Sequence, residues 1–309
     1  MKKVLVTGGT VFVSMNVAKY FADSYDVYVL NRGNFPQLEN VTWINADRTT
    51  LTDELNGLKF DIILDVNAYT EDDVRTLLEH VEGFEEYVLV SSSAVYPETN
   101  PLPFTETQPV GPNSFWNGYG TNKIAAEKYL LSKVEDAIIL RPPYLCGYGN
   151  AIYRESFVFE CALSDRIFYL PGNGELKLQF FDVKDLCRFI DLILSKKSNG
   201  EITQADYPLI YNVGNPDTIT VAEWVKMCYS IVGKTPEFKN VDDSHFIRSY
   251  FPFANYEYVL DISKQCTIMP DTRPLVQSLT ESYEWYKNNK GNVLTRPYLE
   301  YIETNIENK

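Results

Sequence analysis

The sequence predicts an α/β protein in which a doubly wound parallel sheet is followed by a smaller, mixed α/β substrate domain. Two observations support this fold class. Strand-like apolar runs alternate with helix-like segments up to about residue 150, and beyond that point the strict alternation fades. Strands that alternate with helices form parallel sheets whose two faces are both covered. The 309 residues suffice for about two domains of roughly 150 residues each.

The individual elements follow from the spacing of apolar residues. Strands are expected at residues 3–6, 27–30, 41–45, 61–66, 87–91 and 137–140, with a later one at 209–213. Helices are expected at residues 12–22, 72–81, 117–133, 157–164, 183–194, 221–232 and 275–287. Prolines between residues 97 and 112 exclude a helix or a central strand there and predict a long loop. We therefore expect a first domain of residues 1–150 plus about 178–214, and a second of residues 151–177 plus about 215–309.

The composition narrows the classes of partner. A net charge of −14 opposes binding to phosphate backbones, so no nucleic-acid partner is expected. Five cysteines without a C-x-x-C pair and two distant histidines predict reduced thiols and no metal site. The N-terminal apolar run is too short for a signal peptide, and no stretch approaches the roughly 18 apolar residues of a membrane span. A cytoplasmic protein with a small-molecule substrate is therefore expected.

Tyr119 and Lys123 form the most informative pair in the chain. Four residues apart on a predicted helix, they share one face. An ammonium beside a phenol lowers the phenol's pKa from about 10 toward neutrality. A tyrosinate could then take a proton from a substrate hydroxyl while hydride leaves the same carbon. Because the chain has 22 tyrosines, the spacing alone also fits two surface residues on a helix.

Gly8 and Gly9 lie between the first strand and the first helix, where a doubly wound fold binds pyrophosphate on the helix N-terminus. In a G-x-x-G-x-x-G spacing the three positions are Gly8, Val11 and Ser14. Ser14 is small enough for close packing of helix on strand. Val11 is the departure, because a β-branched side chain disfavours positive φ and the close approach of phosphates. The loop therefore either works in an altered form or has lost affinity for a cofactor.

The second strand is followed by Asn31 and Arg32, where the adenosine ribose of a dinucleotide is expected. An acid there would hold the 2′-hydroxyl of NAD, whereas an arginine suits the 2′-phosphate of NADP. Arg32 and the missing acid favour NADP over NAD modestly, unless Arg32 is simply a solvated turn residue. Asp47, after the third strand, could either meet the adenine amine or cap the helix that follows.

Together these segments resemble the NAD-dependent epimerase/dehydratase branch of the extended short-chain dehydrogenase/reductase superfamily, which has a Rossmann-type fold. The similar stretches are residues 7–10 (TGGT), 90–96 (VSSSAVY), 119–127 (with Y-x-x-x-K), 140–143 (LRPP), 181–185 (with V-x-D) and 211–214 (YNVG). Residues 31–33, 47–48 and 68–69 are similar to an atypical subgroup of largely unassigned bacterial members, which has some RNA-binding plant relatives.

The resemblance implies roles residue by residue. Ser92 would hydrogen-bond the reacting oxygen, Tyr119 would be the acid/base, and Lys123 would hold the nicotinamide ribose and depress the pKa of the tyrosine. The implied cofactor contacts are Thr7, Gly8, Gly9, Thr10, Val11, Phe12, Asn31, Arg32, Asp47, Ala68, Tyr119, Lys123 and Pro142. The implied substrate contacts are Ser93, Tyr144, Lys177 and Arg248.

Several positions depart from the family pattern. Dehydratases carry Asp-Glu after the catalytic threonine, but Ser93 and Ala94 stand here, so sugar 4,6-dehydration is not expected. Tyr144 replaces an asparagine usual near the nucleotide phosphates, and Leu178 stands near the place of an arginine that clamps pyrophosphate. A nucleotide sugar loses support as the substrate, although Arg248 and Arg273 could compensate from the second domain.

The leading prediction is an NAD(P)-dependent epimerase or reductase of a hydroxyl or keto carbon in a sugar-like substrate. The alternative is a non-catalytic, dinucleotide-sensing protein of the same fold, which Val11 and the altered substrate positions favour. RNA binding by analogy with the plant relatives conflicts with the charge of −14. The resemblance also implies a homodimer that pairs the helix carrying the tyrosine motif with its neighbour.

Overall fold

A seven-stranded sheet dominates the N-terminal part of the computed structural model, which describes residues 1–242 and 244–307. Its strand order is β10-β6-β5-β4-β1-β2-β3, and every neighbouring pair is parallel. The strands are β1 (Lys3–Thr7), β2 (Asp26–Asn31), β3 (Thr42–Asn45), β4 (Ile62–Asp65), β5 (Glu86–Val90), β6 (Ile138–Arg141) and β10 (Leu209–Asn212). The predicted fold class is confirmed, since this order reverses beside β1 as in a Rossmann-type doubly wound sheet.

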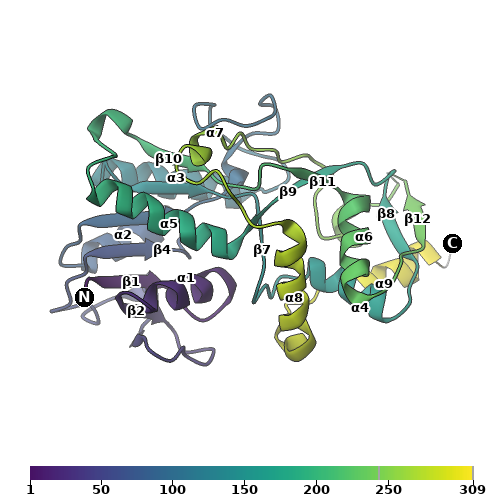
Figure 1. Ribbon diagram of the computed structural model, residues 1–309, viewed down its shortest axis with the longest axis horizontal. Coiled ribbons are helices and arrows are strands. Elements are labelled where there is room, and N and C mark those ends of the chain that lie inside the picture. The colour runs from purple at the N-terminus through teal and green to yellow at the C-terminus, as the bar shows by residue number, and fades with distance from the viewer. Residues whose placement is uncertain (243, 308–309) are drawn as a thin grey trace.

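Two helices cover each face of this sheet. One face carries α1 (Phe12–Ala22) and α5 (Val183–Ser198), which Figure 1 shows in front of the sheet. The other carries α2 (Glu71–His80) and α3 (Gly118–Lys133). Alternate residues of β1 separate the two cores, because Val4 and Val6 pack with α1 and α5 while Leu5 packs with α2 and α3.

The C-terminal part contains two small sheets, one ordered β11-β9-β7 and the other pairing β12 with β8. Their strands are β7 (Tyr144–Cys146), β8 (Phe168–Pro171), β9 (Lys177–Asp182), β11 (Thr218–Thr220) and β12 (Phe238–Val241). The helices here are α4 (Glu155–Leu163), α6 (Val221–Val232), α8 (Leu275–Asn289) and α9 (Tyr298–Ile302), whereas the short α7 (Ser263–Cys266) lies beside β10 of the large sheet. These five strands were not predicted: β7 and β11 have only three residues each, and all five pair with one another, outside the alternating strand–helix pattern. The division of the chain into two domains, and the boundaries given for them, stay a prediction.

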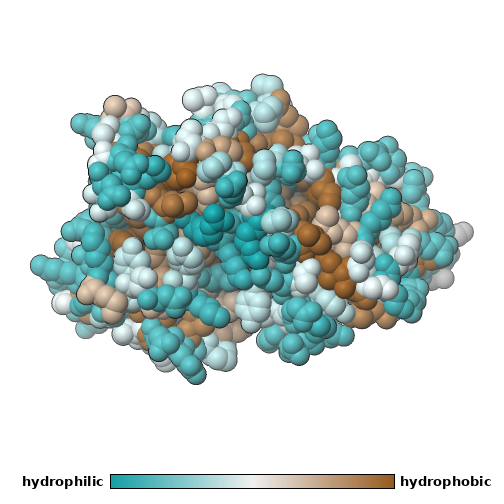
Figure 2. Space-filling view, viewed as in Figure 1, coloured by the Kyte–Doolittle hydropathy of each residue, from teal (hydrophilic) through white to brown (hydrophobic). Residues whose placement is uncertain are grey.

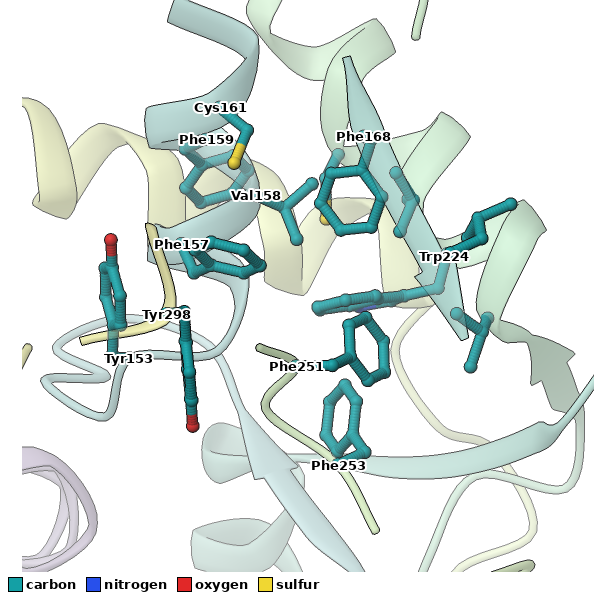
Figure 3. Packing of buried hydrophobic residues seen from close by; sticks show 14 of the residues in the cluster. Tyr153, Phe157, Val158, Phe159, Cys161, Phe168, Trp224, Phe251, Phe253 and Tyr298 are labelled. Carbon is teal, nitrogen blue, oxygen red and sulfur yellow. The ribbon is translucent and has the colours of Figure 1, made fainter. Parts of the chain in front are cut away.

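An aromatic core holds the C-terminal part together. Trp224 of α6 stacks on Phe180 with ring centroids 5.9 Å apart and meets the edge of Phe253 at 5.1 Å. Figure 3 shows this cluster beside a second stack, in which Tyr153 and Tyr298 lie 5.6 Å apart with their hydroxyls pointing in opposite directions. This core matters for function because Tyr153 and Tyr298 also line the site described below.

The visible surface is mainly polar. Figure 2 shows a mostly hydrophilic face on which hydrophobic residues appear in separate groups. None of the helices within the described residues has both the length and the apolar character that crossing a membrane requires. All five cysteines are free, and four of them are buried, as the sequence predicts for reduced thiols.

Asp65, at the carboxyl end of β4, is the most heavily bonded buried side chain of the larger sheet. It accepts hydrogen bonds from Thr7 Oγ1 at 2.7 Å, from Arg48 at 2.6 and 3.0 Å, and from the Tyr87 hydroxyl at 2.6 Å. Burial alone would raise the pKa of Asp65, but Arg48 and these hydrogen bonds outweigh it and lower the pKa below its usual value. One carboxylate thus joins β1, β4, β5 and the turn after β3.

We expect Asp65→Asn to lower the free energy of unfolding by about 3–5 kcal/mol, because it leaves the buried Arg48 guanidinium without its main counter-charge. Urea unfolding followed by circular dichroism measures the change. Lys2→Gln is the control, since the Lys2–Glu85 pair is about half exposed (49% and 63%) and should contribute under about 1 kcal/mol. Equal losses in the two variants would contradict the structural role of Asp65.

Candidate active site

Two adjoining cavities follow the carboxyl ends of the parallel strands, where open α/β sheets bind ligands. The loop cavity, about 530 Å³, lies beside the glycine loop, and the tyrosine cavity, about 450 Å³, lies between the sheet and the C-terminal part. They form one cleft, because six residues line both: Phe12, Val13, Val66, Tyr69, Ile152 and Leu294. A β-bridge between Ile152 and Leu294 joins two distant segments into the wall of this cleft.

The glycine loop has a backbone conformation and a close packing that favour glycine at positions 8 and 9. Gly8 and Gly9 have φ of 93° and 94°, and a Cβ at Gly9 would lie 2.5 Å from Val29 Cγ1. Val11 is extended, with φ −130° and ψ 134°, so the β-branched residue does not occupy a strained conformation. The positive φ of 37° falls on Phe12 instead. No side chain caps the start of α1, which leaves its first N–H groups available to an anion.

The far end of the loop cavity holds the predicted adenosine-binding residues. Asn31 donates through Nδ2 to the Gly8 carbonyl at 2.7 Å, which ties the end of β2 to the loop. Arg32 forms an exposed ion pair with Asp47 at 3.7 Å. Asp47 also accepts from the backbone N–H of Thr49 at 3.0 Å, and this bond is the main reason why its pKa is lowered. Of the two roles left open for Asp47, the structure shows the capping role, at the short turn Arg48–Thr50.

The loop cavity is lined by Gly8, Thr10, Val11 and Phe12. Three other predicted cofactor contacts, Thr7, Gly9 and Ala68, line neither cavity of the cleft. The Thr7 hydroxyl is turned into the sheet, toward Asp65. Gly9 and Ala68 lie outside both linings, although the Ala68 carbonyl bonds Lys123. Pro142 lines the tyrosine cavity.

Ser92, Tyr119 and Lys123 line the tyrosine cavity together. Gly120 explains how Tyr119 reaches Ser92, because a side chain at Gly120 would collide with the carbonyl oxygen of Ala94. The start of α3 therefore packs directly on the backbone that follows Ser92. Ser92 lies close enough to hydrogen-bond the phenol of Tyr119.

Lys123 is buried, with 2% of its surface exposed. Its Nζ donates to the carbonyls of Ala68 at 2.6 Å and Val90 at 2.9 Å, at the ends of β4 and β5. Burial lowers the pKa of Lys123 to about 8, and the charges of Asp65 and Glu127 oppose that shift. The ammonium also lies 5.1 Å from the centre of the Tyr69 ring.

Tyr119 differs from the expectation drawn from its spacing to Lys123. Although 37% of the residue is exposed, burial of the phenol end raises its pKa to about 12, and only the hydrogen bond from Ser92 and the charge of Arg154 oppose the rise. The expected lowering of the tyrosine pKa by Lys123 is therefore wrong for this structure. The two backbone carbonyls engage the ammonium, and desolvation of the phenol dominates.

The structure places only some of the predicted substrate contacts in the cleft. Ser93, Tyr144 and Arg248 line the tyrosine cavity, but Lys177 is exposed on β9 and lines neither cavity of the cleft. Arg273 does not compensate for the missing family arginine, because it pairs with Asp182 at 3.1 Å and Glu281 at 2.6 Å.

Several lining residues escaped the sequence analysis: Trp116, Tyr153, Arg154, Tyr258, Arg296 and Tyr298. They come from loops and element ends far apart in the chain, and no spacing rule connects them. Arg48 was also missed as the partner of Asp65, although its place after the third strand was noted. Within the described residues, no group of three or more His, Cys, Asp or Glu side chains could hold a metal ion.

Comparison with known proteins finds several similar sequences and several solved structures of the same fold. The chloroplast stem-loop binding protein of 41 kDa b from Arabidopsis thaliana is 26% identical, over 91% of this chain and 78% of the relative. UDP-glucose 4-epimerase from Corynebacterium glutamicum is 24% identical, over 75% and 80% of the two chains. The structure of dTDP-glucose 4,6-dehydratase from Bacillus anthracis in complex with NAD has a TM-score of 0.71 at 20% identity and covers 94% and 98% of the two chains.

The sequence profile of the NAD dependent epimerase/dehydratase family matches residues 4–214, which include the glycine loop, Ser92, Tyr119 and Lys123. Because the match spans more than half of the chain, this protein belongs to the NAD dependent epimerase/dehydratase family.

Proposed function

We propose that the protein is an NAD(P)-dependent epimerase or reductase that acts on a hydroxyl or keto carbon of a sugar-like substrate, a class that includes nucleotide sugars. One observation carries the proposal: Ser92, Tyr119 and Lys123 surround a single cavity that opens into the cavity of the glycine loop. The uncapped start of α1 and the positive φ of Gly8 and Gly9 fit a dinucleotide pyrophosphate at that loop.

Each of the three residues has a distinct role in this proposal. The Tyr119 oxygen takes the proton of a substrate hydroxyl, and it returns a proton in the reverse direction. Ser92 bonds the reacting oxygen and stabilises the ionised tyrosine, because its hydrogen bond already lowers the pKa of the phenol. Lys123 holds the nicotinamide ribose from its position between the ends of β4 and β5. A bound dinucleotide supplies the hydride acceptor and donor.

Sugar 4,6-dehydration is not proposed. Elimination of water needs a further acid/base pair, and Ser93 and Ala94 stand where dehydratases carry Asp-Glu. None of the described residues that line the tyrosine cavity is Asp or Glu, so no other carboxyl group replaces that pair.

A non-catalytic, dinucleotide-sensing role is the second proposal. The observation that favours it is the high pKa of Tyr119, about 12, which leaves the phenol protonated at neutral pH. The stem-loop binding protein among the relatives suggests RNA as a further ligand, but the net charge of −14 opposes it. A homodimer also remains a proposal.

Replacing Tyr119 tests the leading proposal. With a panel of UDP- and dTDP-hexoses and hexuronates plus NAD or NADP, we expect Tyr119→Phe to lower kcat by about 100-fold or more while dinucleotide affinity stays unchanged. Because the pKa is about 12, log kcat of the wild type should rise with pH between about pH 7 and 9, and the variant should lose this slope. Tyr20→Phe, outside the cleft, is the control. A substrate that Tyr119→Phe turns over at full rate would contradict the proposal.

Arg32 tests the choice of cofactor. We expect Arg32→Gln to weaken NADPH binding by about tenfold and to leave NADH binding nearly unchanged, because the exposed guanidinium lines the loop cavity, where it would pair with a 2′-phosphate. Asp47→Asn should strengthen NADPH binding, since it removes the carboxylate that competes for Arg32. Isothermal titration calorimetry with both reduced dinucleotides measures these changes. Equal losses of NADH and NADPH affinity in Arg32→Gln would show that Arg32 does not distinguish the 2′-phosphate of NADPH from the 2′-hydroxyl of NADH.

The lowered pKa of Lys123 should make the free energy of unfolding depend on pH. Its pKa of about 8 lies below the usual value near 10.5, so between these values the unfolded chain holds a proton that the folded chain has released. Stability therefore rises with pH in that window, and the wild type should gain about 2 kcal/mol relative to Lys123→Met between pH 7 and pH 10. Urea unfolding at several pH values measures the gain. Lys128→Met, exposed on the same helix, is the control: it retains Lys123 and should keep the wild-type rise in stability with pH.

A further inference from the structure

The tyrosine cavity is cationic in a chain that is strongly acidic. Arg154, Arg248 and Arg296 line it together with Lys123, and none of the described lining residues is Asp or Glu. The whole chain carries 42 acidic against 28 basic residues, so this segregation of charge is local. Within the described residues, no carboxylate forms an ion pair with any of the three arginines.

Arg154 is the arginine with the strongest need for a partner. Only 9% of its surface is exposed, and its Nε is buried without a hydrogen-bond partner. Its guanidinium lies over the Tyr144 ring, 5.6 Å from the centroid, which offers a cation–π contact but no hydrogen-bond acceptor. The neighbouring Glu155 forms no ion pair with it: Glu155 Oε1 accepts from Asn150 and from Ser282 of α8, and Glu155 Oε2 is itself buried without a hydrogen-bond partner.

Other polar atoms in the same cavity share this condition. The hydroxyls of Tyr144 and Tyr258 and the Trp116 Nε1 are buried without hydrogen-bond partners, and all three residues line the cavity with Arg154. Leaving a buried polar group unpaired costs about 1–3 kcal/mol, and more for a charged group. Four such groups around one cavity are explained if a polar ligand completes their hydrogen bonds.

The position of Arg154 places the missing acceptor near the reacting end of the ligand. Arg154 is the arginine whose positive charge opposes the rise in the pKa of Tyr119. Arg248 and Arg296 lie farther out, because they also line a third cavity of about 570 Å³ with Tyr298 and Tyr301. The order from the inside outward is therefore Tyr119, Arg154, and then the Arg248–Arg296 pair.

We propose that Arg154 binds an oxyanion carried by the sugar-like part of the substrate itself, a carboxylate or a phosphate next to the carbon that reacts. A guanidinium binds either group through two parallel hydrogen bonds, and burial strengthens such bonds. The inference rests on the proposed function for the sugar-like nature of the ligand. It adds that the protein distinguishes an acidic substrate from its neutral counterpart, with Arg154 as the residue that sets this specificity.

Binding measurements separate this inference from turnover. UDP-glucose and UDP-glucuronate differ only in a hydroxymethyl and a carboxylate group, and glucose 6-phosphate presents a phosphate at the same carbon. We expect calorimetry, with NAD present, to show at least about tenfold tighter binding of an acidic probe than of UDP-glucose. Arg154→Gln should abolish that preference and leave UDP-glucose affinity within about twofold. Arg154→Lys should retain part of the preference, because an ammonium keeps the charge but lacks the guanidinium fork.

Thermal unfolding distinguishes a ligand-binding role from a structural one. Because Arg154 Nε is buried without a hydrogen-bond partner and no described carboxylate pairs with Arg154, Arg154→Gln should have a Tm equal to or above that of the wild type. Arg75→Gln, which removes a guanidinium from α2 outside the cleft, is the matched control and should leave the preference intact. A carboxylate preference or a phosphate preference that depends on Arg154 supports the inference and identifies the oxyanion.

Three outcomes would overturn the inference: no probe binds, UDP-glucose binds as tightly as both acidic probes, or Arg154→Gln weakens all probes equally. These outcomes are distinct from failure of the proposed function. If Arg154-dependent binding is seen but no probe is turned over, the site recognises an acidic ligand in a non-catalytic protein. If neutral sugars react through Tyr119 without a preference for acidic probes, the proposed enzymatic function is supported and the proposed acidic specificity is wrong.

Discussion

The buried carboxylate of Asp65 is the interaction on which both the sheet and the site depend. It joins β1, β4, β5 and the turn after β3 at the sheet edge where the cleft opens. Its partner Arg48 extends the network to Asn67 and Asp73, which line the loop cavity. The charge of Asp65 also opposes the fall in the pKa of Lys123. The group that stabilises the strand ends therefore also helps to set the protonation of a proposed catalytic residue.

The fold was largely predictable because its information is periodic. All seven strands of the large sheet and the helices on both of its faces lie within a few residues of the predicted ranges, since apolar spacing and glycine turns encode them locally. The strands of the small sheets are short and contact residues distant in the chain, so local patterns do not reveal them. Ser92, Tyr119 and Lys123 were predictable from motifs, whereas Arg154 and Arg296 reach the site only through tertiary packing.

Two chemical interpretations depended on properties that residue spacing does not contain. The concern over Val11 considered a positive φ at that position, but the backbone places that conformation on the next residue, Phe12, and the effect of Val11 on cofactor affinity stays a prediction. The expected lowering of the Tyr119 pKa counted the nearby charge of Lys123 and not the desolvation of the phenol. Backbone conformation and burial are properties of the folded chain, and residue spacing does not report them.

Charge separation within the molecule explains why an acidic ligand would need a dedicated site. A net charge of −14 repels anions from most of the surface, so weak binding of a negatively charged substrate by scattered lysines is disfavoured. Inside the cleft the balance reverses, because three arginines and Lys123 face the cavity and no described lining residue carries a carboxylate. Low local dielectric then strengthens each contact with an anion. A neutral ligand would gain nothing from this arrangement and would leave the cost of burying Arg154 uncompensated.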